Sequence, residues 1–296
     1  MEDTVLVEPP SCGTDEVELL VFVMSAPGHE AARQTIRNTW GGKLHKSSNV
    51  RVLYILGREA AVSGDILVED FQDTYLNLTL KSTFMLKWIT RHCSQTKFVF
   101  KIDDDVFVNA EKLWETLEST QLYFKSIPIK GLDGEFKSKG TDYALIGHVM
   151  NTVPIRDPTS KWYLPPKFYP LNIFPTFLSG TGYIFSGSLA TPLYLCALKT
   201  PFINLEDVFI TGLCATTQLG LRLTHNPGFQ WRPMTVGGTH TCNYKQSVLV
   251  HGSFQPDTIQ DIFSKAQDDL LCDTILFHLL SSLSTLTDFF RNIFRI

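Results

Sequence analysis

Basic residues are too few and too scattered for this chain to bind nucleic acid. The 296 residues include 26 lysines and arginines against 30 aspartates and glutamates, which gives a net charge of −4. No run of basic residues occurs, so the positive patch that a phosphate backbone requires is missing. We therefore predict no nucleic-acid partner.

Zinc-binding spacings, internal repeats and low-complexity segments are absent as well. None of the six cysteines forms a C-x-x-C pair or another zinc spacing. The composition is 44% hydrophobic and 19% charged, which argues against disorder and is enough to build a sizeable core. The length fits one large domain, or one domain with an extension.

A signal peptide or apolar anchor is also missing from residues 1–16, which we expect to form a loose lead-in. The even number of widely spaced cysteines permits disulfides, and Asn77 begins the sequon Asn77-Leu78-Thr79. Both features fit the lumen of the secretory pathway. We therefore expect either an anchor outside this chain or a protein that is not secreted.

Strand-like and helix-like patterns alternate through the first part of the chain. This alternation predicts an α/β fold, with a mostly parallel sheet and helices on its faces. Later segments predict a helix with an acidic start, a short strand that ends on a histidine, and a last helix. The expected strands are 17–26, 50–56, 65–69, 98–102 and 247–251, and the expected helices are 30–40 (ending at Gly41-Gly42), 75–92, 205–221 and 256–271.

Three consecutive aspartates, Asp103, Asp104 and Asp105, directly follow the apolar strand 98–102. Ligands of open α/β sheets bind beyond the carboxyl ends of the strands. Adjacent carboxylates repel one another, and a divalent cation with oxygen ligands removes that cost. The alternative is a solvated acidic turn or the cap of a helix near Asn109, but apolar strands on both sides favour a cleft.

Two further segments could carry chemistry. His251 ends a strand, and a histidine added to carboxylates favours Mn²⁺ over Mg²⁺, although a structural role is the alternative. Glu206 and Asp207 begin a helix, where they could stabilise the helix dipole. The functional alternative is that a carboxylate there acts as a general base toward an acceptor hydroxyl.

Basic side chains offer candidates for binding a diphosphate. Arg33 and Arg37 lie four residues apart on one helical face and could clamp a diphosphate. The alternative is an ordinary solvated face, and the same two interpretations apply to Lys81.

Eight segments together resemble the β-1,3-glycosyltransferases, a nucleotide-sugar-dependent family that includes β-1,3-galactosyltransferases and β-1,3-N-acetylglucosaminyltransferases. They occur in the family's order and together cover roughly residues 17–265. One such motif would be weak evidence, but eight in order are specific. The segments are RQTIRNTWG (33–41), YILG (54–57), EDFQDTYLNLTLKS (69–82), KIDDDVFVN (101–109), KWYLP (161–165), YPLNIFPTFLSGTGYIFSG (169–187), LEDVFITGLC (205–214) and SVLVH (247–251).

The resemblance implies a GT-A fold and a lumenal catalytic domain of a type II membrane protein of the Golgi, whose anchor is not visible in this chain. The nucleotide-sugar half would span 17–109 and the acceptor half 110–272. Residues 273–296 lie beyond the family's usual end. Their amphipathic spacing, interrupted by Asp288 and Arg291, predicts a tail that does not cross a membrane.

The same resemblance assigns roles to residues. The metal motif falls on the three aspartates, with Asp105 and His251 as metal ligands, and the catalytic base falls on Asp207. The expected donor contacts are Arg33, Arg37, Asp70, Lys81, Asp103 and Asp104. The expected acceptor contacts are Trp162, Tyr183 and Glu206, of which Trp162 and Tyr183 could stack on a sugar or belong to the core.

The implied reaction is inverting transfer of galactose from UDP-galactose, with Mn²⁺, to the 3-hydroxyl of an acceptor sugar on a glycoprotein or glycolipid. FPTFLSGTGYIFSG (174–187) and NPGFQW (226–231) resemble the galactosyltransferase branch most. The alternatives are UDP-N-acetylglucosamine as donor and an inactive sugar-binding relative. A metal-dependent phosphohydrolase would explain the acidic cluster but not the other segments.

The cysteine pattern departs from the family. Galactosyltransferases often have cysteine where this chain has Leu178 and aspartate where it has Ser188, and Cys196 has no counterpart that we recognise. The resemblance implies a bond between Cys214 and Cys242. We also pair Cys12 with Cys93, because these residues precede strands that would be neighbours in a parallel sheet.

Overall fold

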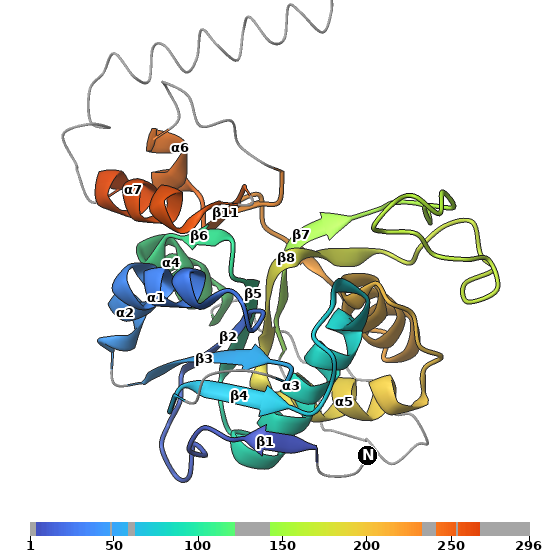
Figure 1. Ribbon diagram of the computed structural model, residues 1–296, viewed down its shortest axis with the longest axis horizontal. Coiled ribbons are helices and arrows are strands. Elements are labelled where there is room, and N and C mark those ends of the chain that lie inside the picture. The colour runs from blue at the N-terminus through green and yellow to red at the C-terminus, as the bar shows by residue number, and fades with distance from the viewer. Residues whose placement is uncertain are drawn as a thin grey trace, which may run out of the picture.

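The computed structural model describes residues 4–47, 49–58, 63–121, 143–232, 241–252 and 254–266. Within them, one sheet has the strand order β1-β4-β3-β2-β5-β8-β7-β9, and a small sheet has the order β10-β11-β6 (Figure 1). The strands are β1 Val5–Val7, β2 Leu19–Met24, β3 Val50–Leu56, β4 Ile66–Glu69, β5 Phe98–Asp103, β6 Val106–Val108, β7 Leu145–Met150, β8 Phe177–Ser186, β9 Thr224–His225, β10 Phe229–Gln230 and β11 Leu249–His251.

The centre of the large sheet is parallel, as the strand–helix alternation predicted. β2 pairs in parallel with both β3 and β5, and β3 pairs in parallel with β4. Their carboxyl ends therefore meet at one edge. β8 pairs antiparallel with β5 and with β7, so the second half of the chain extends the same sheet.

Helices cover both faces of this sheet. Side chains alternate along β2, so both faces of the sheet are apolar and each contributes to a separate core. Leu20 and Phe22 face one core and Leu19 and Val21 face the other. The first core includes α3 Leu78–His92 (preceded by the turn η1 Tyr75–Asn77), α5 Ala190–Lys199 (preceded by η2 Gly187–Leu189) and the π-helix η3 Val208–Gln218. The second includes α1 Glu30–Asn38, α2 Trp40–His45, α4 Ala110–Gln121, α6 Thr241–Gln246 and α7 Pro256–Ala266. The expected α/β fold, a mostly parallel sheet with helices on both faces, is confirmed (Figure 1).

Three details differ from the expectations. The lead-in is not loose throughout, because Val5–Val7 adds an antiparallel edge strand to β4. Gly41 and Gly42 do not end the first helix: they lie inside α2, where buried Trp40 anchors the chain through a hydrogen bond of 3.1 Å from its indole nitrogen to the Val106 carbonyl. The expected helix after Glu206 and Asp207 is a π-helix, a form common at functional sites.

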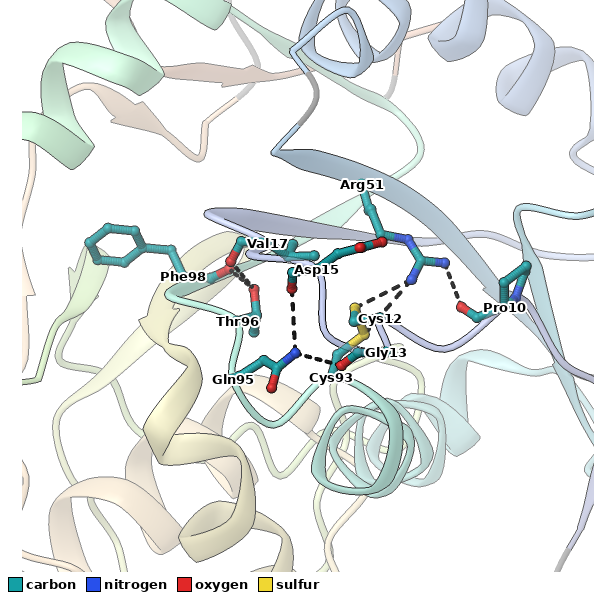
Figure 2. Close-up of a disulfide and its surroundings, with 10 residues drawn as sticks. All are labelled: Pro10, Cys12, Gly13, Asp15, Val17, Arg51, Cys93, Gln95, Thr96 and Phe98. Atoms are coloured by element: carbon teal, nitrogen blue, oxygen red, sulfur yellow. Dashed lines mark hydrogen bonds between the residues drawn. A yellow bond between two sulfur atoms is a disulfide. The ribbon is translucent and has the colours of Figure 1, made fainter.

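A disulfide between Cys12 and Cys93 joins the N-terminal segment to the end of α3, with the Cα atoms 5.0 Å apart (Figure 2). The predicted pairing of these two residues is confirmed. The Cys12 amide also donates to the His92 carbonyl at 2.9 Å, and the Arg51 guanidinium donates to the Pro10 carbonyl at 2.6 Å. The segment before β2 is thus fixed at the edge opposite to the carboxyl ends of the parallel strands.

In the part of the chain that the structure describes, no helix is long and apolar enough to cross a membrane. The predicted tail, 273–296, lies outside the described residues.

Candidate active site

The register of the small sheet brings His251 to the aspartates. β11 runs antiparallel to β6, and His251 lies opposite Val106, the residue that follows Asp105. As a result the Nε2 atom of His251 is 3.5 Å from an Oδ2 atom of Asp105. These two residues, 146 positions apart in the sequence, are the pair that the resemblance assigned to the metal.

The donor set fits a divalent cation such as Mn²⁺. The Nδ1 atom of His251 lies 3.0 Å from the Trp231 carbonyl, which orients Nδ1–H toward that oxygen. Although burial lowers it, the pKa of His251 is raised by the Asp105 carboxylate beside Nε2, and a cation bound there would replace the proton on Nε2. The side chains of Asp103 and Asp105 are each 34% exposed, so both carboxylates reach solvent. Burial and the charge of Asp105 raise the pKa of Asp103 to about 6, although Lys101 opposes this, so a cation bound nearby would offset the repulsion between these carboxylates.

Among the described residues no group of three or more His, Cys, Asp and Glu side chains is arranged to hold a metal ion. An imidazole and a carboxylate alone would leave most coordination positions to oxygens from outside the protein, as is usual for Mg²⁺ or Mn²⁺ bound with phosphates.

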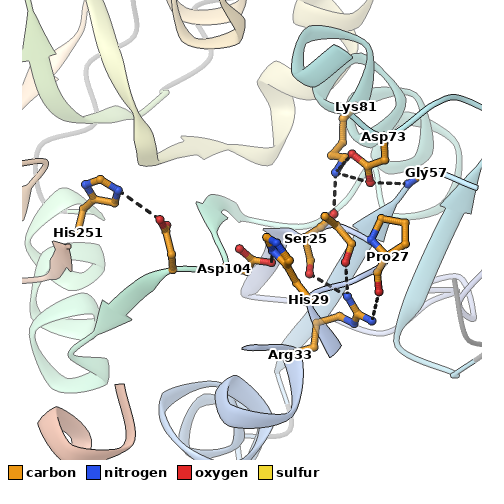
Figure 3. A network of polar contacts seen from close by, with 11 residues as sticks. Ser25, Pro27, His29, Arg33, Gly57, Asp73, Lys81, Asp104 and His251 are labelled. Atoms are coloured by element: carbon orange, nitrogen blue, oxygen red, sulfur yellow. Dashed lines mark hydrogen bonds and ion pairs between the residues drawn. The ribbon is translucent and has the colours of Figure 1, made fainter. Parts of the chain in front are cut away.

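The middle aspartate, Asp104, contacts a residue that the sequence analysis missed. The Nδ1 atom of His29 lies 2.9 Å from Oδ2 of Asp104, which is largely buried, whereas the His29 side chain is 57% exposed (Figure 3). His29 directly precedes α1, in the loop after β2. Its position after the glycine that ends an apolar strand is a signal that could have indicated it.

Arg33 and Arg37 each already have partners within the protein. Arg33 is buried and donates to the carbonyls of Ala26 and Pro27 at 2.6 and 3.2 Å, so it fixes the loop that carries His29 (Figure 3). Arg37 forms two bonds to Asp65 at 2.7 and 2.9 Å. Their direct contact with a donor stays a prediction.

Lys81 reaches the carboxyl edge of the sheet and pairs there with a second residue that the sequence analysis missed, Asp73. The Lys81 ammonium is 2.6 Å from Oδ1 of Asp73 and donates to the Ser25 carbonyl at 2.6 Å (Figure 3). Asp73 in turn accepts the Gly57 amide at 2.8 Å. This buried ion pair therefore connects the ends of β2 and β3.

Asp70, the donor contact expected from the same segment, points elsewhere. Its carboxylate pairs with Arg58 at the surface, and its side chain is 38% exposed. Both aspartates lie in the connection between β4 and η1, where no periodic pattern in the sequence indicates which side chain turns toward the site.

A buried lysine, Lys101, connects two carboxylates of the site, Asp103 and Glu206. The Lys101 ammonium is 2.8 Å from Oδ1 of Asp103 and 3.4 Å from Oε2 of Glu206. The Tyr183 hydroxyl donates to Oε1 of Glu206 at 2.7 Å. Although burial lowers it, the pKa of Lys101 is raised by the charges of Asp103 and Glu206, so the ammonium form is favoured.

Two of the expected acceptor contacts are thereby corrected. Tyr183 is completely buried, so its ring has no free face on which a sugar could stack. Glu206 is also buried, and its carboxylate is bonded to Tyr183 and Lys101 rather than presented to an acceptor.

The carboxylate of Asp207, at the start of η3, is fixed by two backbone amides. Its Oδ2 atom accepts the Gly180 amide of β8 at 3.1 Å, and its Oδ1 atom accepts the Val208 amide at 2.8 Å. Burial and the charge of Glu206 raise the pKa of Asp207 to about 6. A Cβ atom on Gly180 would lie 3.2 Å from Oδ2 of Asp207, so glycine is what allows the strand to approach this closely.

Exposed aromatic side chains border these carboxylates. Trp162 is 47% exposed and Tyr75 is 42% exposed, and the ammonium of Lys161 lies 4.6 and 5.4 Å from their ring centroids. Burial and the charges of Asp207 and Asp103 raise the pKa of Tyr75 to about 12. Trp162 is therefore available for the stacking contact expected of it.

The sequon at Asn77 lies at the end of η1. The Asn77 amide donates to the Gln72 carbonyl at 2.8 Å, and the Thr79 hydroxyl is buried against the Ile203 carbonyl at 2.8 Å. Glycosylation at Asn77 stays a prediction.

Several known proteins are similar in sequence to this chain over most of its length. Residues 31–227 match the family described as Galactosyltransferase. The "Beta-1,3-galactosyltransferase 1" of Homo sapiens is 34% identical over 270 residues, which covers 87% of this chain and 76% of that protein. The "Beta-1,3-galactosyltransferase 5" of Pan troglodytes is 36% identical over 262 residues, which covers 82% and 80%.

A solved galactosyltransferase, in complex with donor and acceptor sugar analogues, aligns with 84% of this chain and 96% of its own, at 8% identity and a TM-score of 0.40. The family match covers more than half of the sequence, and the relatives above are more than 30% identical over most of it. The chain therefore belongs to the galactosyltransferase family.

Proposed function

We propose that the protein is an inverting β-1,3-galactosyltransferase, which transfers galactose from UDP-galactose to the 3-hydroxyl of an acceptor sugar on a glycoprotein or glycolipid. The names of its relatives support the reaction class. The observation that carries the proposal is the Asp207 carboxylate, held by two backbone amides beside the aspartates that follow β5.

Asp105 and His251 would hold the metal, for which we propose Mn²⁺. When bound, such an ion neutralises the negative charge that develops on the leaving diphosphate. The orientation of His251 by the Trp231 carbonyl prepares it for that role.

Asp207 would take the proton from the acceptor 3-hydroxyl as that oxygen attacks the anomeric carbon. The bond from the anomeric carbon to UDP breaks on the opposite face, so one displacement gives the β-linked product. A pKa of about 6 suits a general base at neutral pH, because the carboxylate is mostly ionised and still basic enough to accept a proton. The two backbone amides aim the carboxylate and hold it still.

Lys101 would act as a positioning residue beneath the reacting groups. Its ammonium contacts Asp103 and Glu206, so it offsets part of the repulsion among the carboxylates. On the donor side, Lys81 and Asp73 would keep the ends of β2 and β3 in place, and Arg33 would do the same for the loop that carries His29. Trp162 and Tyr75 would contact the acceptor sugar.

We propose a lumenal, Golgi-type location. The Cys12–Cys93 disulfide supports an oxidising compartment, because such bonds persist in secreted and lumenal proteins and are rare in the cytosol.

A donor–acceptor matrix tests the proposed function. Purified protein with Mn²⁺ should release UDP from UDP-galactose when an acceptor sugar is present, and the product should carry a β-1,3 linkage. Preference for UDP-N-acetylglucosamine would change the donor and leave the fold and base in place. No turnover with any donor and a broad panel of acceptors would support the inactive sugar-binding alternative.

A further inference from the structure

Two cysteines of the second half lie side by side in the core. Cys196 belongs to α5 and Cys214 to η3, and both thiols are free and completely buried. The Thr200 hydroxyl oxygen lies 3.4 Å from the sulfur of Cys196 and 3.6 Å from the sulfur of Cys214. The two thiols also shift each other's pKa, which requires them to be close together. The family-based pairing of Cys214 with Cys242 is therefore wrong for this structure, in which Cys214 lies against Cys196.

We propose that Cys196 and Cys214 form a second disulfide, which joins α5 to η3. The bond would close a ring of the chain from 196 to 214, and that ring contains Glu206 and Asp207. It would thus secure the beginning of η3, where the carboxylate of Asp207 is held.

The surroundings of the two sulfurs favour this bond. The Cys12–Cys93 disulfide indicates that the chain folds where thiols are oxidised. The hydrogen bond from Cys214, and weaker contributions from Thr200 and Lys199, lower the pKa of Cys196 to about 7 in spite of burial. The same hydrogen bond and burial raise the pKa of Cys214. The opposite directions of the two pKa shifts reflect the direct contact of the two thiols in the packed core.

Oxidation needs an acceptor for two electrons, and a small-molecule disulfide such as oxidised glutathione supplies it. The Cys196 thiolate attacks one glutathione sulfur, which forms a mixed disulfide and releases the first glutathione thiolate. Cys214 then gives up its proton and attacks the Cys196 sulfur, which releases the second. Two thiols of the chain become one disulfide, and one glutathione disulfide becomes two thiols. Since both sulfurs are buried in the folded chain, this exchange belongs to folding, before α5 and η3 have packed.

Pairing Cys196 with Cys214 also leaves an even number of cysteines for any further bond. Four of the six cysteines are then used in two bonds, and Cys242 and Cys272 are the two that remain.

The test is peptide mapping of the full chain, secreted from cells with an oxidising secretory pathway. The protein is unfolded in denaturant with iodoacetamide and no reductant, digested with trypsin, and analysed by mass spectrometry. Cleavage after Lys199 separates the two cysteines, so the bond appears as a linked peptide pair that disappears on reduction. The expected result is this pair together with the Cys12–Cys93 pair. Alkylated Cys196 and Cys214, or a peptide that links Cys214 to Cys242, would overturn the proposal.

Stability gives an independent measurement. Cys196→Ser and Cys214→Ser should each lower the thermal midpoint by roughly 5–10 °C under non-reducing conditions. The double variant should lose little more than either single variant, because one bond is lost in all three. Additive losses from the two single variants would show two separately packed thiols instead. Both measurements are made without any transfer assay, so they do not depend on the proposed function.

Discussion

Replacing Asp207 with asparagine separates a catalytic carboxylate from a structural one. The side chain keeps its size but loses its charge and its capacity to accept a proton. Loss of a general base lowers turnover by ~10²–10⁴-fold, which corresponds to about 3–5 kcal/mol of the activation barrier. UDP-galactose binding should change little, because the base faces the acceptor.

Whereas Asp207→Asn should lower turnover, loss of the buried charge should by itself raise the stability of the folded chain at neutral pH. Folding raises the pKa of Asp207 from 3.8 to about 6, so the folded chain is the form that holds the proton more tightly. The wild type should therefore lose stability as the pH rises from about 4 to 6, by up to about 3 kcal/mol at neutral pH. Asp207→Asn removes that loss. Its amide NH₂ must, however, face one of the two backbone N–H groups, Gly180 or Val208, at a cost of ~1–3 kcal/mol.

The variant should thus be about as stable as the wild type at pH 7 while being nearly inactive. Turnover is measured as UDP release with UDP-galactose and acceptor between pH 5 and 8, and stability by denaturant unfolding at pH 4.5 and 7. In the wild type, turnover should rise with pH and level off above the pKa of the base. Asp73→Asn is the matched control, because it leaves the buried Lys81 ammonium without its partner and should cost about 3–5 kcal/mol of stability. Turnover within tenfold of wild type for Asp207→Asn would refute the base assignment.

Four further expectations follow from the same geometry. Gly180→Ala would push a Cβ atom to 3.2 Å from Oδ2 of Asp207, so kcat should fall about tenfold with little change in the KM for UDP-galactose; an unchanged kcat would show that the strand yields. Chelation should abolish transfer and Mn²⁺ should restore it, and full activity in excess chelator would exclude a metal role. His251→Ala should raise the Mn²⁺ concentration needed for half-maximal activity by at least ~10-fold. Trp162→Ala should raise the acceptor KM by ~10-fold, about 1.4 kcal/mol, and leave the KM for UDP-galactose in place. Truncation after Cys272 should leave transfer largely intact, and loss of folding would place the tail in the core.

The central strands near the site followed from local sequence patterns. Short apolar runs predicted β2, β3 and β5, and the rule that ligands bind at carboxyl ends predicted that Asp103 and Asp105 face a cleft. The contact between Asp105 and His251 did not follow from spacing. It depends on the register between β6 and β11, which the sequence does not encode locally, and only the family resemblance indicated it.

Other parts of the site were missed for physical reasons. Asp73 and His29 lie in connections, where no periodic pattern indicates which side chain turns inward. Lys101 could have been found, because a single lysine inside an apolar strand must have buried partners, and here these are Asp103 and Glu206. Tyr183 failed as a stacking residue because residues alternate along β8, which turns its ring into the core.

The antiparallel pairing of β5 with β8 means that the two halves of the chain do not meet at a hinge. Phe98 to Ile102 are in register with Ser186 to Gly182, so the strand that ends at Asp103 is bonded to the strand whose Gly180 amide holds Asp207. Asp103 and the Gly180 amide that holds Asp207 thus lie on neighbouring strands of one sheet. Their separation is set when the chain folds and not when substrates arrive, which is the condition for electrostatic preorganisation. In the proposed reaction we therefore expect closing movements in the loops around the sheet and not between β5 and β8.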